Sequence, residues 1–317
     1  MSAQSYTAAT SVDEALEAMA AGARPIAGGT DLVVGARGGK APLPDALVAI
    51  HRVSELRGIR EQDGGLVLGA LATHADIVAS STACELFTAL ADASAIVGSH
   101  ATRNAGTIGG NVMNASPAME TGGPLICFDA TVTLQAAQLP APAGRPRTGS
   151  GTRELRVAEL FAGPGATTAD AGELLTSVRV PAPAPGTGSC YARLEYRRQM
   201  EIAIVGATAV VTLDGGQVSD ARIAITALAP TIRRVAEAEA VLVGSDGGEA
   251  AARAAADAAA AASQPISDVR GSADYRRAMA AVIARRAIVV AVARAGGQQF
   301  PIPASPALHG AVEGGAA

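Results

Sequence analysis

The N-terminal part of the chain alternates short apolar runs with short amphipathic segments. Ser-Val-Asp-Glu at 11–14 has the form of a helix capping box, and it predicts a helix over 12–21. Apolar runs at 24–26 and 46–51 predict strands, with a second helix beginning at Leu32 between them. Residues up to about 58 are therefore expected to form a small α/β unit.

The following segment mixes strand and helix patterns. Strands are predicted at 66–71, 131–136 and 173–180. Helices are predicted after Thr73 and over 86–97, with a helix end at 125–130. Residues 102–114 are rich in Gly, Asn and Thr, so we expect a loop there, and a second loop at 140–152. This pattern indicates a second α+β unit.

A proline-rich stretch at 181–188 (PAPAPGTG) has the composition of an extended linker and is the clearest domain boundary. Beyond it, apolar runs at 203–213 and 221–228 flank Asp-Gly-Gly, a strong signal for a β-hairpin. Helices are predicted at 233–241, 248–262 and 273–295. The fold class is therefore α+β. The domains are 1–180, with subdomains of about 1–58 and 59–180, a C-terminal domain at 189–296 with an antiparallel sheet and helices, and a flexible tail at 297–317.

Composition narrows the classes of function. The net charge of −4 argues against a nucleic-acid binder, which normally shows a clustered basic face. The most apolar late stretch is interrupted by Arg285, Arg286 and Arg294, so no membrane span is predicted. The first residues lack a basic region followed by an apolar one, and we therefore expect no signal peptide and a cytoplasmic protein.

The cysteines and histidines do not form a recognisable metal site. Cys84, Cys127 and Cys190 have no CxxC spacing and are expected to be buried apolar residues. An iron–sulfur cluster needs about four thiolates, and the four histidines are isolated from one another. The sequence therefore predicts no metal ligands, and it offers no catalytic residue.

The first candidate binding segment is Pro-Ile-Ala-Gly-Gly-Thr-Asp-Leu at 25–32, between a strand and a helix. Consecutive glycines let backbone N–H groups point into one concavity, which suits a pyrophosphate. The segment is neither GxGxxG nor a Walker loop. Taken alone, it could equally be a tight turn that needs glycine.

A second glycine-rich segment, RNAGTIGGN at 103–111, is followed by Ala-Ser-Pro at 115–117. Its glycines permit close backbone approach, and Thr107 and Asn111 offer side-chain hydrogen bonds to phosphate or ribose. Two such loops, about 80 residues apart, could grip one dinucleotide from both ends.

Together these segments resemble the pair of FAD loops in the medium subunits of the xanthine dehydrogenase and carbon monoxide dehydrogenase family of molybdenum hydroxylases. The resemblance continues in ELLTSVRVP at 173–181, YAR at 191–193, RRQMEIAIVG at 197–206 and SADYRR at 272–277. The resemblance covers about residues 11 to 294. It implies an FAD-binding domain of two subdomains, similar to flavoproteins of the vanillyl-alcohol oxidase type.

The resemblance also implies the residues that bind FAD. The first loop would wrap the pyrophosphate and ribityl region with Ile26, Ala27, Gly28, Gly29, Thr30, Asp31 and Leu32. The second would hold the other side and the adenosine end with Thr107, Ile108, Gly109, Gly110 and Asn111. Val97 stands where some relatives pack a residue on the isoalloxazine ring. Leu175 and Ile204 stand where the family approaches the flavin from the second domain.

Some of these positions allow a second interpretation. Relatives commonly have Asp where this chain has Glu120, which we take as a candidate for a ribose hydrogen bond. NAD-reducing relatives can carry a basic residue at Ile204, so its absence lowers the expectation of NAD as acceptor. Val97 and Leu175 could be plain core residues. The basic residues Arg193, Arg197 and Arg198 are expected to form a solvated face, or else a docking patch for an acidic partner or a flavin phosphate.

By resemblance, the chain is an FAD-binding electron-transfer subunit of a heterotrimeric molybdenum hydroxylase. A small subunit with two [2Fe-2S] clusters would supply electrons, and a large subunit with the molybdopterin cofactor would hold the substrate. A dimer of heterotrimers is expected. Two other possibilities are a self-sufficient FAD oxidase or dehydrogenase, for which only Tyr191 and Tyr196 could supply a base, and a non-enzymatic binding module. The hydroxylated substrate and the terminal acceptor (quinone, cytochrome, oxygen or NAD) stay open.

Overall fold

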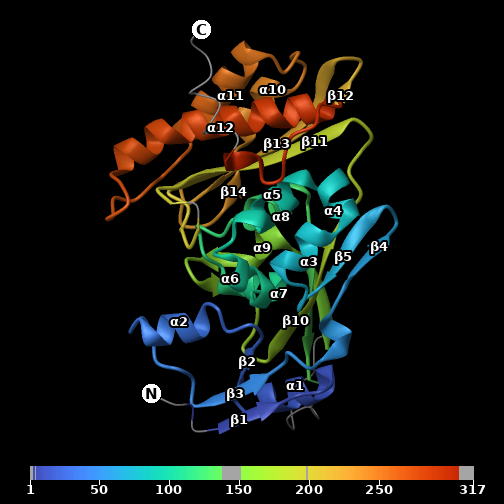
Figure 1. The fold of residues 1–317 in the computed structure, drawn as a ribbon, viewed down its shortest axis with the longest axis vertical. Coiled ribbons are helices and arrows are strands. Elements are labelled where there is room, and N and C mark those ends of the chain that lie inside the picture. The colour runs from blue at the N-terminus through green and yellow to red at the C-terminus, as the bar shows by residue number, and fades with distance from the viewer. Residues whose placement is uncertain (1–2, 4, 138–150, 198, 307–317) are drawn as a thin grey trace, which may run out of the picture.

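The computed structural model describes residue 3 and residues 5–137, 151–197 and 199–306. Three layers follow one another along the long axis of the molecule (Figure 1). A small N-terminal unit lies at one end, a five-stranded sheet with short helices lies in the middle, and a helix-covered sheet lies at the other end. The predicted loop at 140–152 falls largely outside the described residues.

The N-terminal unit is a three-stranded parallel sheet in the order β1-β3-β2, with two helices. Its elements are β1 (Ser5–Ala8), α1 (Val12–Ala20), β2 (Arg24–Ile26), α2 (Leu32–Arg37) and β3 (Ala46–Ala49). The Ser11 side chain caps α1 by accepting from the N–H of Glu14, as predicted. The Glu14 carboxylate turns back to accept from the N–H of Thr10, which closes the start of the helix.

The middle layer is a five-stranded antiparallel sheet in the order β4-β5-β10-β6-β7. Its strands are β4 (Ile59–Gln62), β5 (Gly65–Gly69), β6 (Thr131–Ala136), β7 (Thr152–Arg156) and β10 (Glu173–Val180). Short helices cover it: η1 (Ser54–Leu56), α3 (His74–Ala79), α4 (Ser81–Leu86), α5 (Thr88–Ile96), α6 (His100–Ala105), α7 (Ile108–Asn114), α8 (Gly122–Cys127) and α9 (Val157–Leu160). A small hairpin of β8 (Phe161–Gly163) and β9 (Ala166–Thr167) lies at its edge.

The loop predicted at 102–114 is wrong, because this segment forms most of α6 and all of α7. The side chains of Ser99 and Thr107 cap these two helices. Ile108 and Val112 are buried in the core, and this burial offsets the low helix propensity of the neighbouring glycines.

The C-terminal domain is a four-stranded antiparallel sheet in the order β11-β12-β13-β14, followed by three helices. Its elements are β11 (Thr187–Leu194), β12 (Val205–Asp214), β13 (Gln217–Thr226), β14 (Arg233–Arg234), α10 (Ala236–Leu242), α11 (Glu249–Ala261) and α12 (Ala273–Ala295). Gly215 and Gly216 have φ of 57° and 84°, the paired left-handed conformation of a tight hairpin turn, which confirms the predicted hairpin. The helix predicted at 233–241 begins instead at Ala236, after the short strand β14.

Both faces of this sheet are covered. Helix α12 packs on one face, and α5 and α8 of the middle layer contact the other (Figure 1). Strand β12 is accordingly buried over most of its length, which explains its almost continuous apolar sequence. No helix in the described part of the chain is long and apolar enough to cross a membrane.

A buried aspartate joins the middle layer to the C-terminal domain. Asp92 of α5 accepts from both Nη atoms of Arg294 on α12, at 2.7 and 3.2 Å, and from the backbone N–H groups of Tyr191 and Ala304. Asp92 has no exposed surface, so these hydrogen bonds replace those that its carboxylate would make to water. The flexible tail expected from 297 onward is wrong in its described part, since Ala304 and Ser305 are buried here; residues 307–317 lie outside the described residues.

A second buried ion cluster lies nearby. Arg193 of β11, expected on a solvated face, is fully buried between two carboxylates. It lies 2.5 Å from Glu120 of the middle layer and 2.5 Å from Glu195. The prediction for Arg193 is therefore wrong, because a carboxylate distant in sequence makes its burial possible. Arg197 does stand on the surface, and Arg198 lies outside the described residues.

Replacement of Asp92 with Asn should destabilise the protein strongly. The change leaves the Arg294 guanidinium buried without its counter-charge, which costs about 3–5 kcal/mol of unfolding free energy. Denaturant unfolding measures the loss. Asp257→Asn, on the exposed side of α11, is the control and should stay within about 0.5 kcal/mol of the wild type. A D92N variant as stable as D257N would show that this ion pair does not hold the domains together.

Candidate functional site

The two glycine-rich segments touch each other in the folded chain. A Cβ atom added to Gly28 would lie 1.8 Å from the carbonyl oxygen of Ala105, so only glycine fits there. The first segment comes from the connection between β2 and α2, and the second from the end of α6 and the start of α7. The sequence expectation that both segments serve one site is therefore compatible with their placement.

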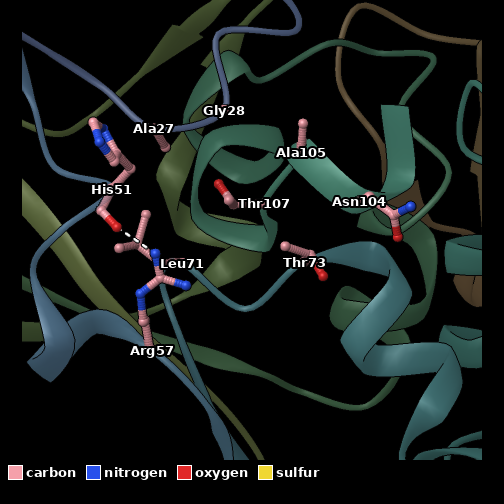
Figure 2. A pocket seen from close by; sticks show the side chains of 9 residues that line it. All are labelled: Ala27, Gly28, His51, Arg57, Leu71, Thr73, Asn104, Ala105 and Thr107. Carbon is pink, nitrogen blue, oxygen red and sulfur yellow. Dashed lines mark hydrogen bonds between the residues drawn. The ribbon is translucent and has the colours of Figure 1, made fainter. Parts of the chain in front are cut away.

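A groove with a volume of about 240 Å³ lies where the segments meet (Figure 2). Its lining residues come from both segments and from the N-terminal and middle layers: Ala27, Gly28, His51, Arg57, Leu71, Thr73, Asn104, Ala105 and Thr107. Usual small-molecule pockets measure about 300–1,000 Å³, so the enclosed part of this groove suits one portion of a large cofactor.

The first segment offers unpaired backbone donors. The N–H groups of Gly28, Gly29 and Thr30 donate to no other group in the described part of the chain. Gly29 has φ of 68°, a left-handed conformation that turns successive N–H groups toward one side. Unpaired N–H groups on one concave turn are suited to an anion such as a phosphate. Asp31 and Leu32 continue this turn into α2.

The second segment uses most of its donors internally. The N–H groups of Ile108 and Gly109 donate to the carbonyls of Ala72 and Ala70, at 2.8 and 3.0 Å. Those of Gly110 and Asn111 donate to the side chain and carbonyl of Thr107. The N–H of Thr107 itself has no partner among the described residues. This segment thus builds one side of the groove, and Thr107 is its best-placed donor.

The remaining candidate residues lie elsewhere. Val97 is half-buried, and its carbonyl accepts from Arg103. Leu175 and Ile204 are buried in the hydrophobic clusters of the middle layer and the C-terminal domain. They present almost no surface to a ligand in this conformation. Ile26 is the last residue of β2 and does not line the groove.

Glu120 is buried and forms an ion pair with Arg193. Burial raises the pKa of its carboxyl to about 7, against the opposing effect of the Arg193 guanidinium. One guanidinium thus balances two carboxylates, Glu120 and Glu195. Within the described residues no group of three or more histidines, cysteines or carboxylates could hold a metal ion.

Sequence reasoning missed one side of the groove. His51 follows β3 and Arg57 follows η1, and neither belongs to a glycine-rich motif. The parallel pairing of β2 with β3 brings the residues after both strands to the same sheet edge. That topology, had it been inferred, would have pointed to His51.

Fold and site together define a class of protein. A groove between two glycine-rich segments, lined by one arginine and no carboxylate, suits an anionic group such as a phosphate, and it lies in a protein of mixed α and β structure. The chain matches the family "FAD binding domain in molybdopterin dehydrogenase" over residues 2–183 and "CO dehydrogenase flavoprotein C-terminal domain" over residues 190–291. It belongs to the family of FAD-binding subunits of molybdenum hydroxylases.

Individual relatives of known name support the membership of this family. The carbon monoxide dehydrogenase medium chain of Hydrogenophaga pseudoflava is 35% identical over 79% of this chain and 83% of the relative. A subunit of the 6-hydroxypseudooxynicotine dehydrogenase complex of Paenarthrobacter nicotinovorans is 35% identical over 92% and 95%. A solved carbon monoxide dehydrogenase from H. pseudoflava matches with a TM-score of 0.84 and 34% identity over 92% of this chain and 98% of that one. The predicted family and fold class are confirmed.

Replacement of Gly28 with Ala should open the contact between the two segments. The added methyl group overlaps the Ala105 carbonyl, so the loops must separate and the N–H groups lose their common direction. We expect FAD retention to fall at least tenfold, measured as acid-released flavin per chain. Gly172→Ala, where a Cβ meets nothing within 4 Å, is the control and should retain the flavin. Wild-type flavin content in G28A would contradict this geometry.

Replacement of Glu120 with Gln should flatten part of the pH dependence of stability. The folded-state pKa of about 7 lies above the ordinary value of 4.5, so the native chain holds an extra proton between these pH values. The contribution of Glu120 to stability therefore falls as pH rises from about 4.5 to 7. Relative to E120Q, the wild type should lose unfolding free energy over this window. Glu237→Gln, an exposed residue of α10, should follow the wild-type profile; an E120Q profile parallel to the wild type would refute the assignment.

Proposed function

We propose that the chain binds FAD with its pyrophosphate in the groove and transfers electrons within a molybdenum hydroxylase complex. The observation that carries the proposal is the set of unpaired N–H groups at Gly28–Thr30, held against Ala105 by a contact that only glycine allows. Gly28 is exposed and Gly29 and Thr30 are half-buried, so these donors are open to solvent and free to bind an anion in place of water. The family to which the chain belongs supplies the identity of the cofactor.

The site residues follow from this placement. The first segment, with Thr107, would hold the pyrophosphate, and Gly110 and Asn111 stand on the accessible side of α7. The flavin end is proposed to extend toward Val97. This position adjoins the C-terminal domain, since the N–H of Met200 donates to the carbonyl of Gly98. Leu175, Ile204 and Glu120 would then not contact the cofactor, and they would instead hold in place the elements that face it.

FAD, when bound, can accept and release electrons singly or in pairs. The role of this chain is to bind and orient it, and the match to FAD-binding domains of molybdopterin dehydrogenases supports this role. We therefore infer a small subunit with two [2Fe-2S] clusters as electron donor and a large molybdopterin subunit as the site of hydroxylation. A dimer of heterotrimers in the cytoplasm is part of the same proposal.

A self-sufficient FAD oxidase finds less support. Of its two candidate bases, Tyr191 is completely buried, and the hydroxyl of Tyr196 donates to the carbonyl of Arg270 at 2.6 Å. Neither lines the groove.

Co-expression with the large and small subunits tests the proposal. We expect a three-subunit complex with iron–sulfur absorbance and one acid-released FAD per copy of this chain, whereas the other two subunits purified without it should lack FAD. The isolated chain should not oxidise any substrate of the complex. A complex that assembles without FAD, or substrate turnover by the chain alone, would contradict the assignment.

A further inference from the structure

The groove contains a single permanently charged side chain. Of the nine lining residues, Arg57 is the only one that carries a fixed charge, and none is acidic. Neither glycine-rich segment places a cationic side chain in the groove lining, since Arg103 of the second segment does not line it. A pyrophosphate carries two negative charges, so a lone guanidinium at the edge of its groove is a natural counter-charge.

Arg57 is held in place although its side chain is exposed. Its neighbours Val53 and Leu56 are buried and fix the turn formed by η1. The Arg57 guanidinium folds back and donates to the carbonyl of His51. One side of its fork is thereby anchored, and the remaining N–H groups stay available for a ligand.

The position of Arg57 selects one half of the dinucleotide. Figure 2 shows His51 and Arg57 on one side of the groove, with Asn104, Ala105 and Thr73 on the other. Helix α6, on the latter side, is linked to the C-terminal domain by the contact of Thr102 with Met200. With the flavin end extending toward that domain, as proposed above, the side formed by His51 and Arg57 faces the adenylate. This moves the adenosine end away from the second segment, where the resemblance placed it.

The other nearby arginine does not take this place. The Arg103 guanidinium donates to the carbonyl of Val97 at 3.0 Å and does not line the groove. Leu71 adds an apolar surface beside Arg57, as a purine ring requires.

We propose that Arg57, anchored by the His51 carbonyl and set beside Leu71, binds the adenylate half of the dinucleotide through its adenosine-side phosphate. This inference rests on the proposed FAD function and assigns a recognition role to residues outside both glycine-rich segments. It makes the end of η1 a third binding segment.

The test uses the assembled complex after removal of its flavin, titrated with FAD and followed by flavin fluorescence. Arg57→Gln should weaken FAD binding by about tenfold to a hundredfold, the range for loss of a charged hydrogen bond. Arg57→Lys keeps the charge without the fork and should lose less. Arg52→Gln removes a neighbouring exposed arginine that does not line the groove, and it should bind FAD as the wild type does.

Two further measurements make the result decisive. ADP should compete with FAD on the wild type, and R57Q should weaken ADP and FAD by the same factor. FAD affinity in R57Q equal to that of the wild type, or ADP that does not compete, would overturn the inference. A wild-type complex that binds no FAD would instead contradict the proposed function itself. If R57Q unfolds at the same temperature as the wild type, its loss of FAD affinity is not caused by misfolding.

Discussion

The groove depends on one backbone contact, that of Gly28 with the carbonyl of Ala105. Through this contact a turn of the N-terminal unit lies directly on a helix end of the middle layer. The turn keeps the N–H groups of Gly28, Gly29 and Thr30 out of any sheet or helix, so they stay open to a ligand. Because the same turn leads into α2, a shift at Gly28 would displace every donor of the first segment together.

The C-terminal domain is joined to this framework by buried charges. The ion pair of Asp92 with Arg294 connects α5 of the middle layer to α12. The ion pair of Glu120 with Arg193 connects the turn before α8 to β11. Buried ion pairs contribute little net stability compared with apolar packing, but they tolerate very little displacement because each charge must keep its partner. An electron-transfer protein benefits from this restriction, since the position of its cofactor relative to a partner must be reproducible.

Local sequence signals were sufficient for much of the fold. The bounds of β2, β6, β10 and α12 agree with the sequence predictions, because apolar runs and capping residues are read from neighbouring positions. The helices α6 and α7 were missed, since their glycines and asparagine suggest a loop and only burial of Ile108 and Val112 favours a helix. His51 and Arg57 were missed for a similar reason, because the pairing of β2 with β3 brings His51 to the groove and the turn of η1 brings Arg57, and motifs reveal neither.

Glu120 is a candidate cofactor residue that the structure places in the interdomain ion cluster, where its carboxylate accepts from the Arg193 guanidinium. Next to it, the Thr121 hydroxyl donates to the side chain of Asn111 at 2.6 Å, so the residue after Glu120 is tied directly to α7. The position therefore links the C-terminal domain to the second glycine-rich segment through adjacent side chains. Two successive residues thus hold the C-terminal domain and α7 to the same turn, although the Glu120 carboxylate does not line the groove.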